Sequence, residues 1–189
     1  MSLLVMKERP VRDLMHSEAY ERFHRSLEAA DAGEPTGFEP ADYDDDRLLR
    51  VLIVDDHQAT ADTLSSQVAI WGHEIQRAYD GVTGLALAAA HRPDVLLLDI
   101  LMPDMSGFEV AWQVRQQDRL RHCFIVAVTG RTDAKHRCRC YEAGVDLVLT
   151  KPVVPSHMQT LLMLESEHVR QLRRSSNVST RRRETAAAY

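Results

Sequence analysis

The strongest constraint on the fold is a regular alternation of short apolar runs with longer amphipathic stretches between about residues 49 and 173. Five runs have the length and composition of strands, namely residues 48–54, 74–79, 94–99, 124–128 and 147–149. Each run is followed by a stretch whose apolar residues recur at helical spacing. Strands that alternate with helices favour right-handed crossovers, and therefore a parallel sheet covered by helices.

The third run marks the centre of the predicted sheet. Residues 95–98 are all large and aliphatic, which is typical of a parallel strand with helices on both of its faces. In sheets of this kind, ligands bind beyond the carboxyl ends of the strands. The residues that follow each run are therefore the first place to look for a functional site.

Polar side chains stand at four of these strand ends: Asp55 and Asp56 after the first, Asp99 after the third, Thr129 after the fourth and Lys151 after the fifth. Ionising clustered carboxylates together is costly without a cation. Oxygen ligands suit Mg²⁺, which uses one or two protein carboxylates together with a phosphate oxygen. Asp99 could then act as a nucleophile that forms an acyl phosphate, with Lys151 as a counter-charge and Thr129 as a hydrogen-bond donor.

Four segments carry a resemblance to a known family: VLIVDDH at 51–57, LLLDILMPDMSG at 96–107, VAVTG at 126–130 and LTKP at 149–152. In this order and at this spacing they are similar to the receiver domain of response regulators in two-component systems. The resemblance covers about two thirds of the chain. It implies an α/β fold with a doubly wound five-stranded parallel sheet and flanking helices, flavodoxin-like, with strand order 2-1-3-4-5.

The resemblance also implies roles for the residues at the strand ends. Asp99 would accept a phosphoryl group from a phosphohistidine on a sensor histidine kinase or a histidine phosphotransfer protein. Thr129 and Lys151 would contact that group. Four residues would be ligands of Mg²⁺: Asp55, Asp56, Asp99 and, through its backbone carbonyl, Leu101.

One position departs from the family pattern. The family usually carries Tyr or Phe three residues before the lysine, and this ring moves with the threonine to transmit the switch. Here the position is Val148, which has no ring to rotate. Phosphoryl acceptance is still expected, whereas the route from Asp99 to a partner stays open.

Other functions were weighed against this one. A phosphatase that forms an aspartyl phosphate would carry a second aspartate two residues after the nucleophile. Leu101 stands there, so the chain is not expected to be an enzyme. A receiver that belongs to a hybrid kinase or larger regulator is a further alternative. His136 lies near Cys138 and Cys140, but residues two apart on a helix point to different sides, so no metal site is expected there.

The flanking segments differ from the central zone, which we assign to residues 49–173. Residues 1–48 read as an extension with one amphipathic helix at about 11–30, followed by an acidic linker. The helix could pack on the domain or mediate self-association. Residues 174–189 read as a disordered basic tail. The tail is too short for a DNA-binding module, so we expect a single-domain regulator that acts on an unknown protein target.

Charge and hydropathy exclude some partners. The formal net charge of -5 gives no bulk reason to expect nucleic acid or an anionic membrane as a partner. No apolar run approaches the roughly 20 residues needed to span a bilayer. Residues 1–12 lack the apolar stretch of a secretory signal, so the expected location is the cytoplasm.

Overall fold

The computed structural model describes residues 48–186 and, before them, Glu21, Arg25, Ser26 and Glu28, with side chains described as far as residue 174. The elements follow one another in this order: β1 (Arg50–Val54), α3 (Gln58–Ile70), β2 (Glu74–Ala78), α4 (Gly81–His91), β3 (Val95–Asp99), α5 (Gly107–Arg115), the short 3₁₀ helix η2 (Asp118–Leu120), β4 (Phe124–Thr129), α6 (Ala134–Glu142), β5 (Leu147–Thr150) and α7 (Pro155–Ala186).

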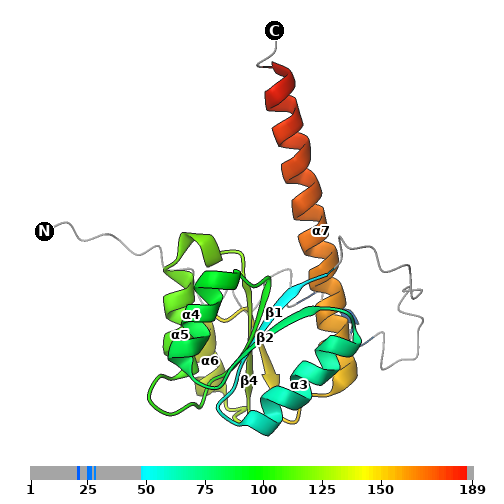
Figure 1. Cartoon of the computed structure of the whole chain (residues 1–189). Helices are drawn as coiled ribbons and strands as arrows, with labels where there is room; N and C mark the ends of the chain where they lie inside the picture. Colours follow the sequence, from blue (N-terminus) through cyan, green and yellow to red (C-terminus); the bar gives the residue numbers. More distant parts are fainter. Residues whose placement is uncertain (1–20, 22–24, 27, 29–47, 187–189) are drawn as a thin grey trace, which may run out of the picture.

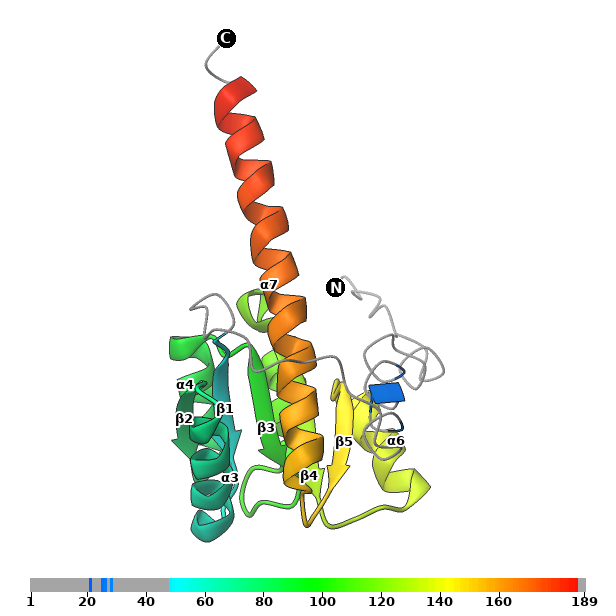
Figure 2. The ribbon, with the colours of Figure 1, turned by 90° about the vertical axis from the view of Figure 1, so that its right-hand side faces the viewer.

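The five strands form one parallel sheet in the order β2-β1-β3-β4-β5, which confirms the predicted order (Figure 2). The first strand, β1, lies between β2 and β3, and the later strands β4 and β5 extend the sheet on the side of β3. In register, Val54 of β1 lies beside Leu98 of β3, and Asp99 lies beside Val128 of β4. The ends of β1, β3 and β4 therefore meet at one edge of the sheet.

Successive side chains of a strand point to opposite faces, so β3 contributes to two separate cores. Leu96 and Leu98 pack in a core with residues of α4, α5 and α6, which we call the α6-side core. Val95 and Leu97 pack in a core with residues of α3 and α7, the α7-side core. Figure 1 shows the same division of the helices between the two faces. All five residues of β3 are buried, as predicted for the central strand.

Three helices on the α6 side begin at polar N-caps. The side chains of Asp80, Ser106 and Asp133 accept hydrogen bonds from the backbone N–H three residues later. Such caps satisfy an otherwise unpaired donor and typically stabilise a helix by about 1 kcal/mol. Asp133 fixes the start of α6, the helix that follows Thr129.

The last helix is longer than predicted. The predicted end at residue 173, with a disordered tail after it, is wrong for residues 174–186, because α7 continues as a helix to Ala186. Nothing between 173 and 186 is a proline or glycine that would end it. Its 32 residues correspond to about 48 Å of helix, and Figure 2 shows α7 extending past the amino-terminal edge of the sheet. Arg173 pairs with Asp94 at 3.5 Å near that edge.

The predicted N-terminal helix and acidic linker lie almost wholly outside the described residues. The four positions described in that segment are helical. Within the part of the chain that the structure describes, no helix combines the length and hydrophobicity needed to cross a bilayer.

Candidate functional site

Three carboxylates meet where β1 and β3 end. Asp55 and Asp99 are buried, with exposed fractions of 1% and 8%, whereas Asp56 is exposed. One oxygen from each of the three lies within 4.8 Å of the others. The structure therefore brings together the three acids that the sequence placed at these strand ends.

Lys151 supplies the counter-charge from the turn after β5. Its Nζ donates hydrogen bonds to Oδ2 of Asp55 at 2.8 Å and to Oδ2 of Asp99 at 2.7 Å. Burial alone would lower the pKa of the ammonium, but the bonds to Asp55 and Asp99 outweigh it and leave the pKa above its usual value. Lys151 is therefore charged at neutral pH and joins the end of β5 to the ends of β1 and β3, neither of which is a neighbour of β5 in the sheet. The Lys151–Pro152 peptide bond is cis.

Backbone donors fix the orientation of both buried carboxylates. Asp55 Oδ1 accepts a hydrogen bond from the N–H of His57, and Asp99 Oδ1 accepts one from the N–H of Leu101, each at 3.0 Å. The start of α5 presses against the same loop. A Cβ placed on Gly107 would lie 2.1 Å from the carbonyl oxygen of Asp99, so only glycine fits there. The Asp99 loop is thus held tightly on two sides.

The donor set fits a hard cation. Three carboxyl groups face one ammonium, so the acidic groups outnumber their counter-charge. Each carboxylate oxygen has two lone-pair directions, so an oxygen that accepts one hydrogen bond can still bind a metal. An exposed acid beside two buried ones suits Mg²⁺, which keeps several of its waters. Leu101, the fourth predicted ligand, follows directly in the loop, with its side chain 54% exposed.

Thr129 ends β4 but has different partners. Its side chain is fully buried, and its Oγ1 lies 3.1 Å from Nε2 of His136 on α6. Oγ1 also accepts a hydrogen bond from the N–H of Arg131 at 3.2 Å. The reasoning from sequence missed this role of His136. A usable signal was present, because Asp133 caps a helix and His136 follows three residues later, in its first turn, where it turns back toward the strand end.

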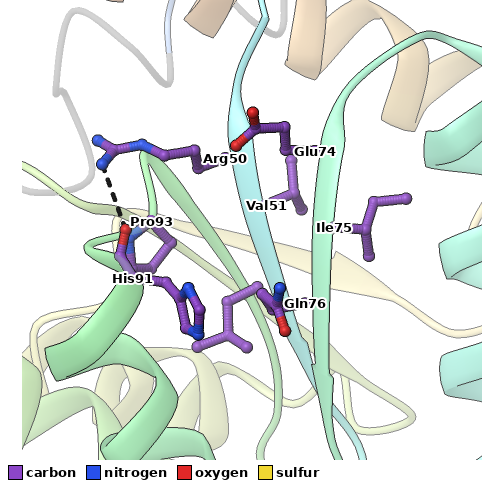
Figure 3. A pocket seen from close by; sticks show the side chains of 8 residues that line it. Arg50, Val51, Glu74, Ile75, Gln76, His91 and Pro93 are labelled. Atoms are coloured by element: carbon purple, nitrogen blue, oxygen red, sulfur yellow. Dashed lines mark hydrogen bonds between the residues drawn. The ribbon is translucent and has the colours of Figure 1, made fainter.

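A pocket of about 290 Å³ lies elsewhere, at the amino-terminal side of the sheet (Figure 3). It is lined by residues of β1, β2 and the end of α4: Arg50, Val51, Leu52, Glu74, Ile75, Gln76, His91 and Pro93. Figure 3 shows Arg50 bonded to the carbonyl oxygen of His91, at 3.2 Å. Arg50 is also paired with Asp94 at 2.9 Å. The pocket shares no residue with the cluster of Asp55, Asp56, Asp99 and Lys151, which we call the acidic edge. We place the functional site at the acidic edge.

Comparison with known proteins agrees with the fold and the site. The sensor histidine kinase RcsC of Salmonella typhi is 33% identical over 146 residues, which cover 77% of this chain and 15% of that protein. The response regulator PleD of Caulobacter vibrioides is 36% identical over 104 residues, which cover 55% of this chain and 23% of PleD. The chain therefore matches less than a quarter of the length of either relative.

Solved structures show the same fold. The chemotaxis protein CheY4 of Vibrio cholerae superposes with a TM-score of 0.59 at 31% identity, covering 61% of this chain and 96% of that one. A CheY-like receiver domain protein of Methanospirillum hungatei gives a TM-score of 0.61 at 27% identity, covering 66% and 98%. The profile of the response regulator receiver domain matches residues 51–163, which is more than half of the sequence. The chain therefore belongs to the response regulator receiver domain family.

Proposed function

We propose that this receiver domain accepts a phosphoryl group on Asp99 from a phosphohistidine donor, with Mg²⁺ bound at the acidic edge, and signals through protein contacts. The observation that carries the proposal is the bridge from Lys151 to two buried carboxylates beside an exposed third one. An ammonium alone does not neutralise three acids, so the edge favours a divalent cation and a group whose oxygens can share it.

The residues of the chain divide the work of transfer. A carboxylate oxygen of Asp99 forms the new O–P bond while the P–N bond of the donor breaks and its electron pair stays with the leaving imidazole. Lys151 holds Asp99 in place and can pair with a phosphoryl oxygen. Asp55, Asp56, Asp99 and the Leu101 carbonyl would hold Mg²⁺. When bound, the ion offsets the charge that the phosphoryl oxygens bring to the site.

We further propose that the chain is an acceptor and not a hydrolase. Leu101 presents an apolar side chain to solvent two residues after Asp99, where a phosphatase of this chemistry would need a carboxylic acid. A leucine at this place can neither donate nor accept a proton from an attacking water.

The donor that this site favours is a sensor histidine kinase or a histidine phosphotransfer protein, and the expected location is the cytoplasm. A second possibility concerns the context of the domain. The likeness to RcsC over 146 residues favours a receiver that works inside a hybrid kinase or larger regulator, which would use the same Asp99 chemistry. The alternative is a receiver that acts by itself through protein contacts, with the N-terminal helix packed on the domain or mediating self-association.

Phosphorylation can be tested directly by intact mass after incubation of the full chain with Mg²⁺ and acetyl phosphate. We expect the mass to rise by one phosphoryl group, and the gain to disappear when Mg²⁺ is chelated. Asp99→Asn should show no gain. A wild-type chain that stays folded and gains no mass would overturn the proposal.

Asp104→Asn is the matched control. It makes the same chemical change five residues away, at an exposed position with a φ of 60°, a conformation that asparagine tolerates as well as aspartate. It should keep the full mass gain. Loss of the gain in both variants would mean that the loop, and not the Asp99 carboxylate, was responsible.

A further inference from the structure

The buried hydrogen bond between Thr129 and His136 joins the end of β4 to the first turn of α6. Both residues are almost completely buried, with exposed fractions of 0% and 5%. The Oγ1–Nε2 distance of 3.1 Å is that of an ordinary hydrogen bond. A buried polar pair of this kind is costly to break unless each partner finds a new one. The bond therefore ties the position of α6 to the orientation of one hydroxyl.

The imidazole of His136 is held from several directions. Its backbone N–H donates to Oδ1 of the cap residue Asp133 at 2.9 Å. Its ring meets the ring of Phe108 on α5 edge to face, with centroids 5.4 Å apart. The guanidinium of Arg139 lies over the ring of Phe108, 4.3 Å from its centroid. A movement of His136 would therefore change contacts of both α5 and α6.

The side chain of Thr129 leaves the sheet on the α6 side, where its hydroxyl meets His136. Val128 belongs to the α7-side core, so Thr129, as the next residue of the strand, faces the α6 side. Asp99 shares its register row with Val128, and Leu98 before it belongs to the α6-side core. The side chains of Asp99 and Thr129 thus leave the sheet toward opposite faces. To bond a phosphoryl oxygen on Asp99, the hydroxyl has to turn away from His136.

The hydroxyl has one proton to donate, and its oxygen already accepts the N–H of Arg131. We infer that His136 is the positioning residue for Thr129, and that exchange of the Thr129–His136 bond for a bond to the phosphoryl group on Asp99 releases the first turn of α6. This inference rests on the proposed function. It gives the signal a path through α6, toward Phe108 and Arg139, in place of the path through β5.

Val148 makes this second path the better one. It is half-buried against the α6-side core and offers only apolar contact to its neighbours. Nothing in its side chain can exchange one polar partner for another. His136 has that property, because a neutral imidazole both donates and accepts, and burial lowers the pKa of His136, which favours the neutral form.

The test measures hydrogen–deuterium exchange of the backbone amides of α6 in the full chain, with and without Mg²⁺ and acetyl phosphate, while intact mass reports phosphorylation. In the wild type we expect exchange in the first turn of α6 to quicken about fivefold on phosphorylation, the factor that corresponds to loss of one net hydrogen bond. His136→Leu should be phosphorylated but show no change between the two states. His136→Gln, whose amide can replace Nε2, should restore the change.

Cys140→Ala is the structural control. Cys140 is buried one turn further along α6 and packs in the α6-side core, so its loss loosens the helix without touching Thr129. This variant should keep the phosphorylation-dependent change. If His136→Leu fails to fold, His136→Met removes the same bond with a more flexible apolar side chain and should likewise abolish the change.

The outcomes separate the two proposals. No mass gain in the folded wild type would overturn the proposed function and this inference together. A mass gain with unchanged exchange in α6, or a change that persists in His136→Leu or His136→Met, would overturn the inference alone and leave the phosphoryl acceptor in place.

Discussion

The acidic edge and the Thr129–His136 pair lie at neighbouring strand ends but are held together in opposite ways. The edge concentrates three negative charges and one positive charge, partly open to water through Asp56 and the 26% exposed side chain of Lys151. The Thr129–His136 pair is neutral and dry. The edge gains by binding a further cation, whereas the pair gains only if both partners remain satisfied.

This difference assigns different work to the two regions. An over-charged edge attracts Mg²⁺ and phosphoryl oxygens and changes its charge when they bind. A neutral buried bond changes little with salt, but it has two discrete arrangements once a competing acceptor appears. Charge at one strand end can thus be converted into a change of packing at the next.

The largest effect on stability is expected at Gly107, where the backbone of Asp99 and Ile100 leaves no space for a side chain. In Gly107→Ala the new Cβ would collide with the carbonyl oxygen of Asp99 and lie 2.7 Å from the Cα of Ile100. Both are backbone atoms that can only move with the loop. We expect a loss of about 3 kcal/mol in the free energy of unfolding, measured in urea. A loss well below 1 kcal/mol would show that the Asp99 loop is not rigid.

Gly130→Ala is the matched change beside Thr129. A Cβ at Gly130 would meet nothing within 4 Å. The substitution should therefore be neutral or stabilise the protein by about 0.4–1 kcal/mol, because alanine restricts the unfolded chain. Comparison of Gly107→Ala with Gly130→Ala therefore distinguishes a position where glycine is required from one where alanine also fits.

The second prediction removes the cation of the edge. Lys151→Met leaves Asp55 and Asp99 without their counter-charge, and we expect a loss of about 2 kcal/mol in unfolding free energy, smaller than for a fully buried pair because the lysine is partly exposed. Mg²⁺ should recover most of this loss and stabilise the variant more than the wild type, since no ammonium competes for the same oxygens.

Lys135→Met is the control for this change, because Lys135 is exposed on α6. Its effect should stay within about 0.5 kcal/mol, with or without Mg²⁺. If Mg²⁺ stabilises Lys151→Met no more than the wild type, then the lysine and the metal do not compete for the same carboxylate oxygens.

The fold and the acidic edge were predictable for the same reason. Apolar runs of strand length fix where each strand ends, and parallel strands deliver their ends to one edge of the sheet. Asp99 is the last residue of β3, and Asp55 and Lys151 come directly after β1 and β5, so their meeting needs no knowledge of side-chain packing. The ends of the five strands were predicted to within one or two residues, and the predicted strand order was confirmed.

The parts that were not predicted depend on contacts between elements. His136 lies seven residues after Thr129, and the cap at Asp133 indicates that it falls in the first turn of α6. That its ring reaches the hydroxyl depends also on how α6 packs on the sheet. The length of α7 was missed for another reason. A polar sequence without glycine or proline satisfies its own backbone hydrogen bonds as a helix, even where it has few apolar residues to bury.

The smallest effect is expected on the pH dependence of the unfolding free energy, and it arises from His136 in the Thr129–His136 pair. Burial holds the pKa of His136 below its ordinary value of 6.5, with Arg131 and Arg139 acting in the same direction and Asp133 opposing them. Below pH 6.5 the unfolded chain therefore takes up a proton that the folded chain resists, and the folded state loses stability as the pH falls toward the folded pKa. His136→Gln keeps a hydrogen-bonding group and cannot titrate, so its unfolding free energy should fall less than that of the wild type between pH 7 and 5. Urea unfolding at several pH values measures the difference, and parallel curves would mean that the imidazole is not confined as the structure places it.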